Sequence, residues 1–498
     1  MQPGILARCA LVIAVFCVAA DASAVQVVLN LPEYPTVHAF GLDQPELNAV
    51  LTDGNSIIYD QGQPVIFEAF VDTGASGFVI SYLQARGYSM DLGGEGDILS
   101  LGLDGSPAGE FVGTYTETGI AGNEVGDISR PFGVRVLNGQ AGMGSVDNLD
   151  QFVSYGQHGL WVRQEMGIEE NAIFAVEPMN IIGMPVIRQR VMVMDPTPLA
   201  NDDRMITNLL PRNDPGIPKT NIGLSVYLKN FSQEAPATLS QSPNPMIRDI
   251  TIASTQTGQR LVDSNNEWLF DTGSGGSFIS FAKAKAIGLI PDSYATLDEY
   301  MASYTGPTAT VGGIGGITTV PMVTVDEVHA RSTTGIDIVW QNVKAMVIDV
   351  AGLDGVFGMN LALPAITIDM GDLGLPEAGA GGLFDLEISP GYFDAIVFDP
   401  TDPSHPTLRL AIDPARLPVP GDATLDRLVD VGDLGVLGAN YGRSSGATWE
   451  TGDFTGDGAV DVGDLGVLGA HYGQPAGTVP EPATLSLLAL GALGLRRR

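Results

Sequence analysis

The stretch FVDTGA at residues 70–75 returns 199 residues later as LFDTGS at residues 269–274. The two copies stay in register, because Ile-Ser follows each Asp after eight residues, at 80–81 and again at 279–280. In both copies two apolar residues lead into Asp-Thr-Gly, which is typical of a buried strand ending in a tight turn. The repetition predicts a duplicated lobe in which each half supplies one Asp.

A second repeat follows each Asp, in which two apolar residues precede Gly-Met, at 181–184 and 356–359. Short runs of Val, Ile, Phe and Thr, bounded by Gly, Asp and Asn, predict strands around these motifs. We therefore expect an all-β body with an N-terminal lobe at 25–200 and a C-terminal lobe at 220–416. A stretch rich in Pro, Asp and Asn predicts a connector between them, at 201–219.

The two Asp residues suggest a specific chemistry if the lobes bring them together. Two carboxylates about 3 Å apart do not both ionise readily, so they share one proton. The ionised partner then takes a proton from a water, and the protonated partner polarises a peptide carbonyl. Asp72 and Asp271 are the predicted catalytic dyad, with no cofactor for catalysis. Four neighbours are expected to support the dyad: Thr73, Gly74, Thr272 and Gly273.

These motifs resemble those of the pepsin family of aspartic proteases, over roughly residues 27–417. The resemblance implies a bilobal pepsin-like fold and an aspartic endopeptidase that cuts peptide or protein substrates. It also implies that the apolar-apolar-Gly motifs pass behind the catalytic loops, and that Tyr115 is the tyrosine of a β-hairpin flap. An ordinary edge-strand tyrosine is the other interpretation of Tyr115. The chain departs from the family in having Ala75 where many members have Ser, and no Trp shortly after Asp72.

Other chemistries find little support in the sequence. The five His residues lack metal-ligand spacing, and neither a G-x-S-x-G nucleophile elbow nor a P-loop occurs. The Gly-rich run at 311–316 has no following Lys and predicts a hairpin turn. Two alternatives stay open. One is an inert secreted binding or surface protein on the same fold, and the other is a peptidase restricted to a single processing target.

A third repeat, 421–442 against 452–473, has the spacing of a calcium loop. Oxygen-bearing side chains occupy loop positions 1, 3, 5, 9 and 12 in both copies, and Gly458 stands at the sharp-turn position 6. The alternative is a solvated acidic linker. The predicted Ca²⁺ ligands are Asp422, Thr424, Asp426, Asp430 and Asp433 in the first loop, and Asp453, Thr455, Asp457, Asp461 and Asp464 in the second.

Each loop leads into Leu-Gly-Val-Leu-Gly-Ala, a helical pattern that places Leu434, Leu437 and Tyr441 on one face of the first helix. The duplicated loop and helix resemble a type I dockerin, which implies a small α-helical calcium-binding module at 417–478 and a cohesin-type partner. Arg427 departs from that family, because position 6 prefers Gly for its positive φ. We expect the first loop to bind Ca²⁺ more weakly for this reason.

The N-terminus predicts a signal peptide at 1–24. Arg8 precedes an apolar run at 10–20, and Ala22-Ser23-Ala24 offers a cleavage site. Cys9 and Cys17, the only cysteines, fall within this segment, so the mature chain has no thiol chemistry.

At the other end, VPEP at 479–482 precedes a mostly apolar run at 483–495 and three Arg residues. This order resembles the PEP-CTERM sorting signal of exported bacterial proteins, in which a sorting enzyme removes the tail. The apolar run is shorter than the roughly 20 residues of a spanning helix, and a permanent weak anchor is the alternative. We expect a secreted or cell-surface protein. Its formal net charge of -34 repels polyanions, so no nucleic-acid partner is expected.

Overall fold

The chain is mostly β-strand, with few and short helices in its main body. It divides into two compact units, one formed by Val27–Leu417 and the other by Met1–Gln26 with Pro418–Arg498. A computed structural model describes residues 25–30, 44–60, 62–81, 84, 111–119, 122–139, 148–163, 180–201, 205–231, 235–333, 336–350, 352–363, 366–369, 385–388, 392–413, 417, 419–424, 426–445, 447, 449–455 and 458–473. The predicted signal peptide at 1–24 and the sorting tail at 479–498 lie outside these residues.

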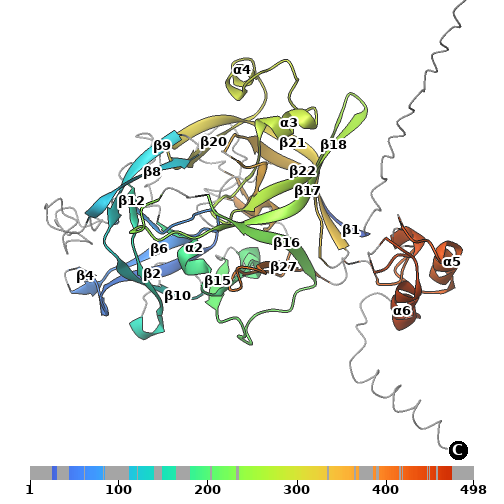
Figure 1. Ribbon diagram of the computed structural model, residues 1–498, viewed down its shortest axis with the longest axis horizontal. Helices are drawn as coiled ribbons and strands as arrows, with labels where there is room; N and C mark the ends of the chain where they lie inside the picture. The colour runs from blue at the N-terminus through green and yellow to red at the C-terminus, as the bar shows by residue number, and fades with distance from the viewer. Residues whose placement is uncertain are drawn as a thin grey trace, which may run out of the picture. The chain divides into compact units, whose positions relative to one another are not determined.

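The first half of the main unit forms a ten-stranded sheet, blue to cyan in Figure 1. Its strand β6 (Ile66–Val71) alternates buried and partly exposed residues, because one of its faces packs on the core. The strand order is β11 (Val153–His158), β10 (Phe132–Leu137), β2 (Glu46–Asp53), β6, β13 (Ile181–Ile182), β7 (Val79–Ser81), β12 (Trp161–Arg163), β9 (Gly122–Ser129) and β8 (Phe111–Gly119), with β3 (Ser56–Ile57) on β2.

The second half forms most of a thirteen-stranded sheet. Its order is β15 (Ile206–Leu210), β14 (Val191–Asp195), β26 (Ala395–Asp399), β27 (Thr407–Ala411), β16 (Ile222–Lys229), β17 (Asn244–Gln256), β18 (Gln259–Phe270), β23 (Gly355–Phe357), β19 (Ser277–Ile279), β22 (Ile336–Val347), β21 (Gly316–Ala330) and β20 (Thr308–Gly313), with β1 (Val25–Asn30) paired to β22.

The stretch at 201–219, for which the sequence predicts a connector, contains β15. This strand pairs with β14, which in turn pairs with β26 near the end of the main unit. Thr207 and Leu209 are buried on one face of β15, so tertiary packing decides the structure of a segment whose composition resembles a loop. The sheet therefore joins strands from both halves of the chain.

The two halves repeat one local topology around each Asp. In the first, β13 pairs parallel with β6 and antiparallel with β7, and β7 pairs parallel with β12. In the second, β23 pairs parallel with β18 and antiparallel with β19, and β19 pairs parallel with β22. The apolar pair before each Asp therefore lies beside the apolar pair before each Gly, with Val71 opposite Ile182 and Phe270 opposite Phe357.

An aromatic cluster fills the core behind the second Asp. Phe270 lies edge-on to Phe398 with ring centroids 5.9 Å apart, and Trp340 lies edge-on to Phe357 with ring centroids 5.3 Å apart.

Short elements complete the main unit. They are β4 (Tyr59–Asp60), β5 (Gln63–Pro64), β24 (Ile366–Asp369), β25 (Asp385–Ile388), α2 (Met184–Ile187), α3 (Phe281–Ala286), α4 (Leu297–Met301) and the 3₁₀ turns Leu149–Gln151, Thr197–Asn201 and Met359–Leu361.

The second unit contains two helices, α5 (Val431–Asn440) and α6 (Val462–His471), and a 3₁₀ turn at Trp449–Thr451. A capping box opens each helix, formed by Asp430 with Asp433 and by Asp461 with Asp464. The small core of this unit consists of Ala423, Val429, Leu437, Ala447, Trp449, Phe454, Val460 and Leu468.

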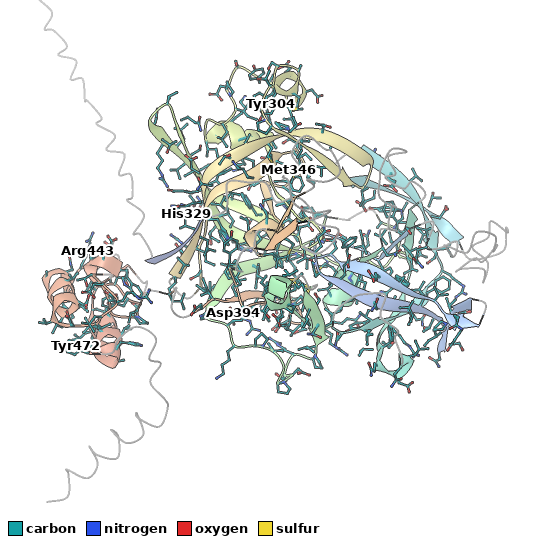
Figure 2. The ribbon with its side chains drawn as sticks, turned by 180° about the vertical axis from the view of Figure 1, so that it is seen from behind. Tyr304, His329, Met346, Asp394, Arg443 and Tyr472 are labelled. Carbon is teal, nitrogen blue, oxygen red and sulfur yellow. The ribbon has the colours of Figure 1, made fainter. Side chains whose placement is uncertain are left out.

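Only the middle residue of each predicted apolar helix face is buried in this core. Leu437 and Leu468 are each 2% exposed, whereas Leu434, Tyr441, Leu465 and Tyr472 are between 39% and 53% exposed. Figure 2 labels Tyr472 at the end of α6.

Candidate active site

The two Asp residues stand at the ends of central strands, each supported by the second repeated motif. The Asp72 backbone N–H donates to the Ile182 carbonyl at 3.0 Å, and the Asp271 N–H donates to the Phe357 carbonyl at 3.1 Å. These bonds extend the parallel ladders by one residue, so each Asp begins its turn in a fixed position. The equivalence of the two bonds explains why the apolar-apolar-Gly motif accompanies each Asp.

Gly183 and Gly358 let these supporting segments approach the Asp loops closely. A Cβ atom at Gly183 would collide with the Gly77 carbonyl oxygen, and one at Gly358 would collide with that of Gly276. The residue after each glycine then bonds to the loop: Met184 N–H donates to the Ala75 carbonyl at 2.9 Å, and the equivalent bond in the second half is 2.8 Å long. On the other side of the second loop, Met346 of β22 (labelled in Figure 2) lies against Gly276.

Each glycine of the two Asp-Thr-Gly motifs lies against the carboxyl group of the opposite Asp. A Cβ atom at Gly74 would lie 2.5 Å from Cγ of Asp271, and one at Gly273 would collide with the carboxyl group of Asp72. The two carboxyl groups are also hydrogen-bonded to each other. The predicted dyad residues, 199 positions apart in the chain, are therefore brought together.

The two threonines connect the loops by four reciprocal hydrogen bonds. Thr73 Oγ1 donates to the Phe270 carbonyl at 2.6 Å and accepts from Thr272 N–H at 3.1 Å. Thr272 Oγ1 donates to the Val71 carbonyl at 2.5 Å and accepts from Thr73 N–H at 3.0 Å. Both threonines are fully buried, so water does not compete for these bonds. They fix the separation of the two carboxyl groups.

The surroundings of the two carboxyl groups favour one shared proton. Asp72 accepts hydrogen bonds from the N–H groups of Gly74 at 2.7 Å and Ala75 at 3.1 Å, and Asp271 accepts one from Gly273 at 3.0 Å. Burial raises the pKa of Asp72, and its hydrogen bonds to Asp271 and the backbone oppose that rise. Burial and the negative charge of Asp72 raise the pKa of Asp271 well above its ordinary value. Asp72 is therefore the group that is more readily ionised, and Asp271 the group that keeps the shared proton.

Two amide side chains that belong to no sequence motif donate hydrogen bonds to the two Asp loops. Asn244 Nδ2 donates to the carbonyl oxygens of Thr73 and Gly74, both at 2.9 Å, and its Oδ1 accepts from Ser76 Oγ at 2.6 Å. Gln44 Nε2 donates to the Gly273 carbonyl. Only the strand register could have identified this pair, because neither residue belongs to a motif.

Tyr115 lies on β8, which pairs with β9 in an antiparallel hairpin. Its carbonyl accepts a hydrogen bond from Trp161 Nε1 at 3.2 Å, and Gly126, its cross-strand partner, packs against the Trp161 ring. Tyr115 also packs on an apolar cluster that includes Ala75 of the first Asp loop. Trp161 of β12 thus contacts this hairpin through its ring and through its indole N–H.

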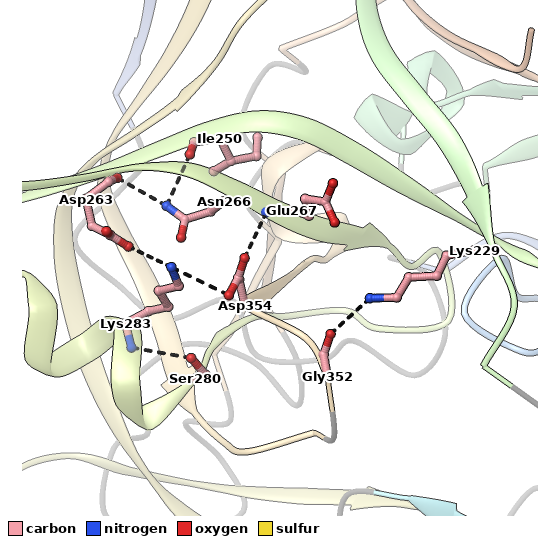
Figure 3. Close-up of polar contacts among 9 residues, drawn as sticks. All are labelled: Lys229, Ile250, Asp263, Asn266, Glu267, Ser280, Lys283, Gly352 and Asp354. Atoms are coloured by element: carbon pink, nitrogen blue, oxygen red, sulfur yellow. Dashed lines mark hydrogen bonds and ion pairs between the residues drawn. The ribbon is translucent and has the colours of Figure 1, made fainter.

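A polar network supports the strand pair behind Asp271 (Figure 3). Lys283 of α3 lies 3.0 Å from Asp263 and 3.5 Å from Asp354, which directly precedes β23. Asp354 also accepts from the Glu267 N–H at 3.1 Å, and its carbonyl accepts from the Ser280 N–H at 2.9 Å. The network ties α3, β18 and β23 together on the side away from the dyad.

In the first acidic loop the structure brings Asp422, Thr424 and Asp433 together. Thr424 N–H donates to Asp433 at 2.9 Å, and its hydroxyl lies 3.3 Å from an Asp422 oxygen. Asp422 and Asp433 are almost fully buried, whereas Asp426 is exposed and Asp430 caps α5. Arg427 adopts a φ of 71°, the left-handed conformation for which position 6 prefers glycine.

The second loop repeats this arrangement with Asp453, Thr455 and Asp464. Thr455 N–H donates to Asp464 at 2.9 Å, and its hydroxyl lies 3.4 Å from an Asp453 oxygen. Asp453 and Asp464 are buried, and Asp461 caps α6. The predicted ligand Asp457 lies outside the described residues.

Each loop therefore holds two buried carboxylates beside a threonine, an oxygen-only donor set of the kind that Ca²⁺ takes. Within the described part of the chain, no three His, Cys, Asp or Glu side chains already gather closely enough to hold a metal ion. A cation in the first loop would require the exposed carboxylate of Asp426 to turn inward.

Comparison with known protein families finds one match. The C-terminal tail is a PEP-CTERM protein-sorting motif, matched over residues 478–498. The match begins one residue before the predicted boundary and confirms the predicted sorting signal. It indicates export and surface sorting, and implies that a sorting enzyme recognises the tail. No curated protein matches the chain. None of the helices described here is long and apolar enough to cross a membrane.

Proposed function

We propose that this exported chain is an aspartic endopeptidase of pepsin-like architecture, in which Asp72 and Asp271 activate a water to hydrolyse peptide bonds. The reciprocal contacts of Gly74 with Asp271 and of Gly273 with Asp72 carry the proposal. A tight turn used only for structure does not require its Asp to lie against an equivalent Asp-Thr-Gly turn from another sheet. The duplicated strand topology around the two loops supports the same conclusion.

The proposed reaction follows from the different surroundings of the two carboxyl groups. Ionised Asp72 takes a proton from a water, and protonated Asp271 donates its proton to the carbonyl oxygen of the scissile peptide. The hydroxide formed adds to the carbonyl carbon, giving a tetrahedral diol with no covalent bond to the protein. Asp72, now protonated, passes its proton to the leaving nitrogen as the C–N bond breaks, while ionised Asp271 takes a proton back from one diol hydroxyl. The products are a carboxylic acid and an amine, and the dyad returns to its starting protonation state. No cofactor takes part.

The test is cleavage of an unstructured protein from acid to neutral pH by the secreted chain. Asp72→Asn and Asp271→Asn are the matched variants, because each keeps the size of the side chain and removes its titration. Cleavage by the wild type that both variants lose, while neither melts at a lower temperature than the wild type, supports the dyad. A folded wild type that does not cleave this protein at any pH contradicts a general endopeptidase and favours an inert binding protein or a peptidase restricted to a single processing target.

For the second unit we propose Ca²⁺ binding by the two acidic loops. Each loop buries two carboxylates beside a threonine, an arrangement of oxygen ligands and negative charge that suits a divalent cation. Asp422, Asp426 and Asp433 would hold the first ion, and Asp453, Asp457 and Asp464 the second. The duplicated loop-helix pattern extends the proposal to a dockerin-like module with a cohesin-type partner.

Fluorescence of Trp449 offers a direct test, since its indole N–H donates to the Asp422 carbonyl at 2.6 Å within the first loop. A Ca²⁺-dependent change that Trp449→Phe removes, and that Asp433→Asn weakens, is the expected result. Unchanged emission and unchanged melting temperature at millimolar Ca²⁺ contradict this proposal.

A further inference from the structure

Two hairpins, one from each half of the chain, meet tip to tip. In Figures 1 and 2 the cyan β8–β9 hairpin and the yellow β20–β21 hairpin approach each other from opposite sides. A Cβ atom at Gly119 would collide with Ile314, and one at Gly315 would lie 2.5 Å from backbone atoms of Gly122. Glycines at both tips therefore permit an approach of backbone to backbone that other residues would prevent.

A hydrogen bond accepted by a buried carboxylate joins the same two hairpins. Glu124 of β9 accepts from the Gly315 N–H at 3.1 Å, and its side chain is 2% exposed. Gly315 has a φ of 87°, which favours glycine at this turn. The turn thus presents its N–H to the opposite hairpin, and the carboxylate receives it out of reach of water.

The apolar side of this contact extends to the first Asp loop. Ile314 and Tyr115 pack on one cluster together with Ala75, and the cluster includes the buried side chains of Trp161 and Ile181. Ala75 N–H itself donates to the Asp72 carboxylate. Both hairpins therefore contribute a side chain to the cluster on which Ala75 packs, and Ala75 is hydrogen-bonded to the dyad.

We propose that β20–β21 is the second half of a two-hairpin gate over the dyad, latched by Glu124 to Gly315 and by Ile314 against Gly119. This inference rests on the proposed peptidase function. Both hairpins must part before a peptide reaches Asp72 and Asp271, and Ile314, which packs on the same cluster as Tyr115, then lines the path of the substrate.

Cross-linking the tips tests the gate directly. The mature chain has no cysteine of its own, so Gly119→Cys with Ile314→Cys creates a single defined pair. A small separation of the tips allows the Cβ distance of about 3.8 Å that a disulfide needs. We expect oxidation to lower peptide cleavage at least tenfold and a reductant to restore it, while each single-cysteine variant stays insensitive to redox state. Full cleavage by a protein shown by mass spectrometry to be cross-linked overturns the gate.

A second measurement needs no catalytic activity and therefore separates the gate from the proposed function. Glu124→Ala removes the latch, whereas Glu124→Gln keeps an acceptor oxygen for Gly315. We expect hydrogen exchange at residues 313–317 to rise severalfold in Glu124→Ala and less in Glu124→Gln. Equal exchange in all three proteins overturns the latch. An inactive wild type with this exchange pattern overturns the peptidase proposal and leaves the contact between the hairpins established.

Discussion

Gln44 and Asn244 occupy equivalent positions in the two halves, and each holds the Asp loop of the other half. Glu46 pairs with Phe70, two residues before Asp72, and Met246 pairs with the residue two before Asp271. Gln44 lies two residues before Glu46, and Asn244 lies two residues before Met246. The two amides therefore occupy the same place relative to their Asp. Gln44 donates to the loop of Asp271, and Asn244 to the loop of Asp72. The two halves therefore exchange amide braces as well as threonine bonds.

Replacing Asn244 should misplace Asp72 and destabilise the main unit. Asn244→Ala removes three hydrogen bonds in a fully buried position and leaves the carbonyls of Thr73 and Gly74 without this donor. We expect a loss of about 2–4 kcal/mol in the free energy of unfolding, since each unsatisfied buried group costs about 1–3 kcal/mol. We also expect a fall in kcat larger than any change in KM. Chemical denaturation and peptide kinetics measure both, and an unchanged kcat contradicts a positioning role.

Gly74→Ala should abolish cleavage, because the added methyl group would lie 2.5 Å from Cγ of Asp271 and force the carboxyl groups apart. Gly113→Ala is the matched control, since a Cβ atom at this glycine of β8 meets nothing within 4 Å. Comparable melting temperatures with cleavage lost only in Gly74→Ala are the expected result. Retained cleavage in Gly74→Ala argues against the close approach of the two loops.

How much of this arrangement the sequence predicts depends on whether a feature repeats. The dyad, its threonines and the motifs with Gly183 and Gly358 each occur twice in matched context, so their pairing follows from symmetry. The braces from Gln44 and Asn244 share only a strand register, which depends on pairings that the sequence does not state. The sequence did not predict the strand β15 for a related reason. Its pairing with β14 outweighs the turn-forming residues around it.

The contact between the two hairpins could not be predicted from the sequence either. The Gly-rich run at 311–316 predicts a hairpin turn, and the structure has β20 and β21 there. Its partner at Gly119 and Glu124 lies almost 200 residues earlier, and no pattern links the two.

The raised pKa of Asp271 makes a prediction about stability as well as rate. Burial and the charge of Asp72 favour the protonated form of Asp271 in the folded state, so the folded protein binds more protons than the unfolded chain. Stability is fully present below the ordinary carboxyl pKa and falls as pH rises through the raised folded pKa. We expect Asp271→Asn, which cannot ionise, to melt at a higher temperature than the wild type at neutral pH, and at a similar temperature in acid. Thermal melts at both pH values measure this; a difference that grows toward acid would contradict the assignment.

The same shifts define the expected pH profile of cleavage. Activity requires one ionised and one protonated carboxyl group. It should therefore fall toward acid pH as Asp72 is protonated, and fall again at higher pH as Asp271 ionises. Ser274→Ala provides a control, because the Ser274 hydroxyl donates to the Gly276 carbonyl and not to either carboxylate. A profile with a single acidic limb would show that only one group titrates in the reaction.

Arg427→Gly should stabilise the second unit and strengthen Ca²⁺ binding by its first loop. Arg427 holds a φ of 71° at position 6, where Gly458 of the second loop has a φ of 80° without the steric cost of a Cβ atom. Relief of this strain is worth about 1 kcal/mol. If the strain is relieved only in the bound loop, the dissociation constant for Ca²⁺ at the first loop falls several-fold. Calorimetric titration of Arg427→Gly and wild type measures the change, with Asp464→Asn used to silence the second loop. An unchanged first-site affinity together with a raised melting temperature would place the strain in both the free and the bound loop.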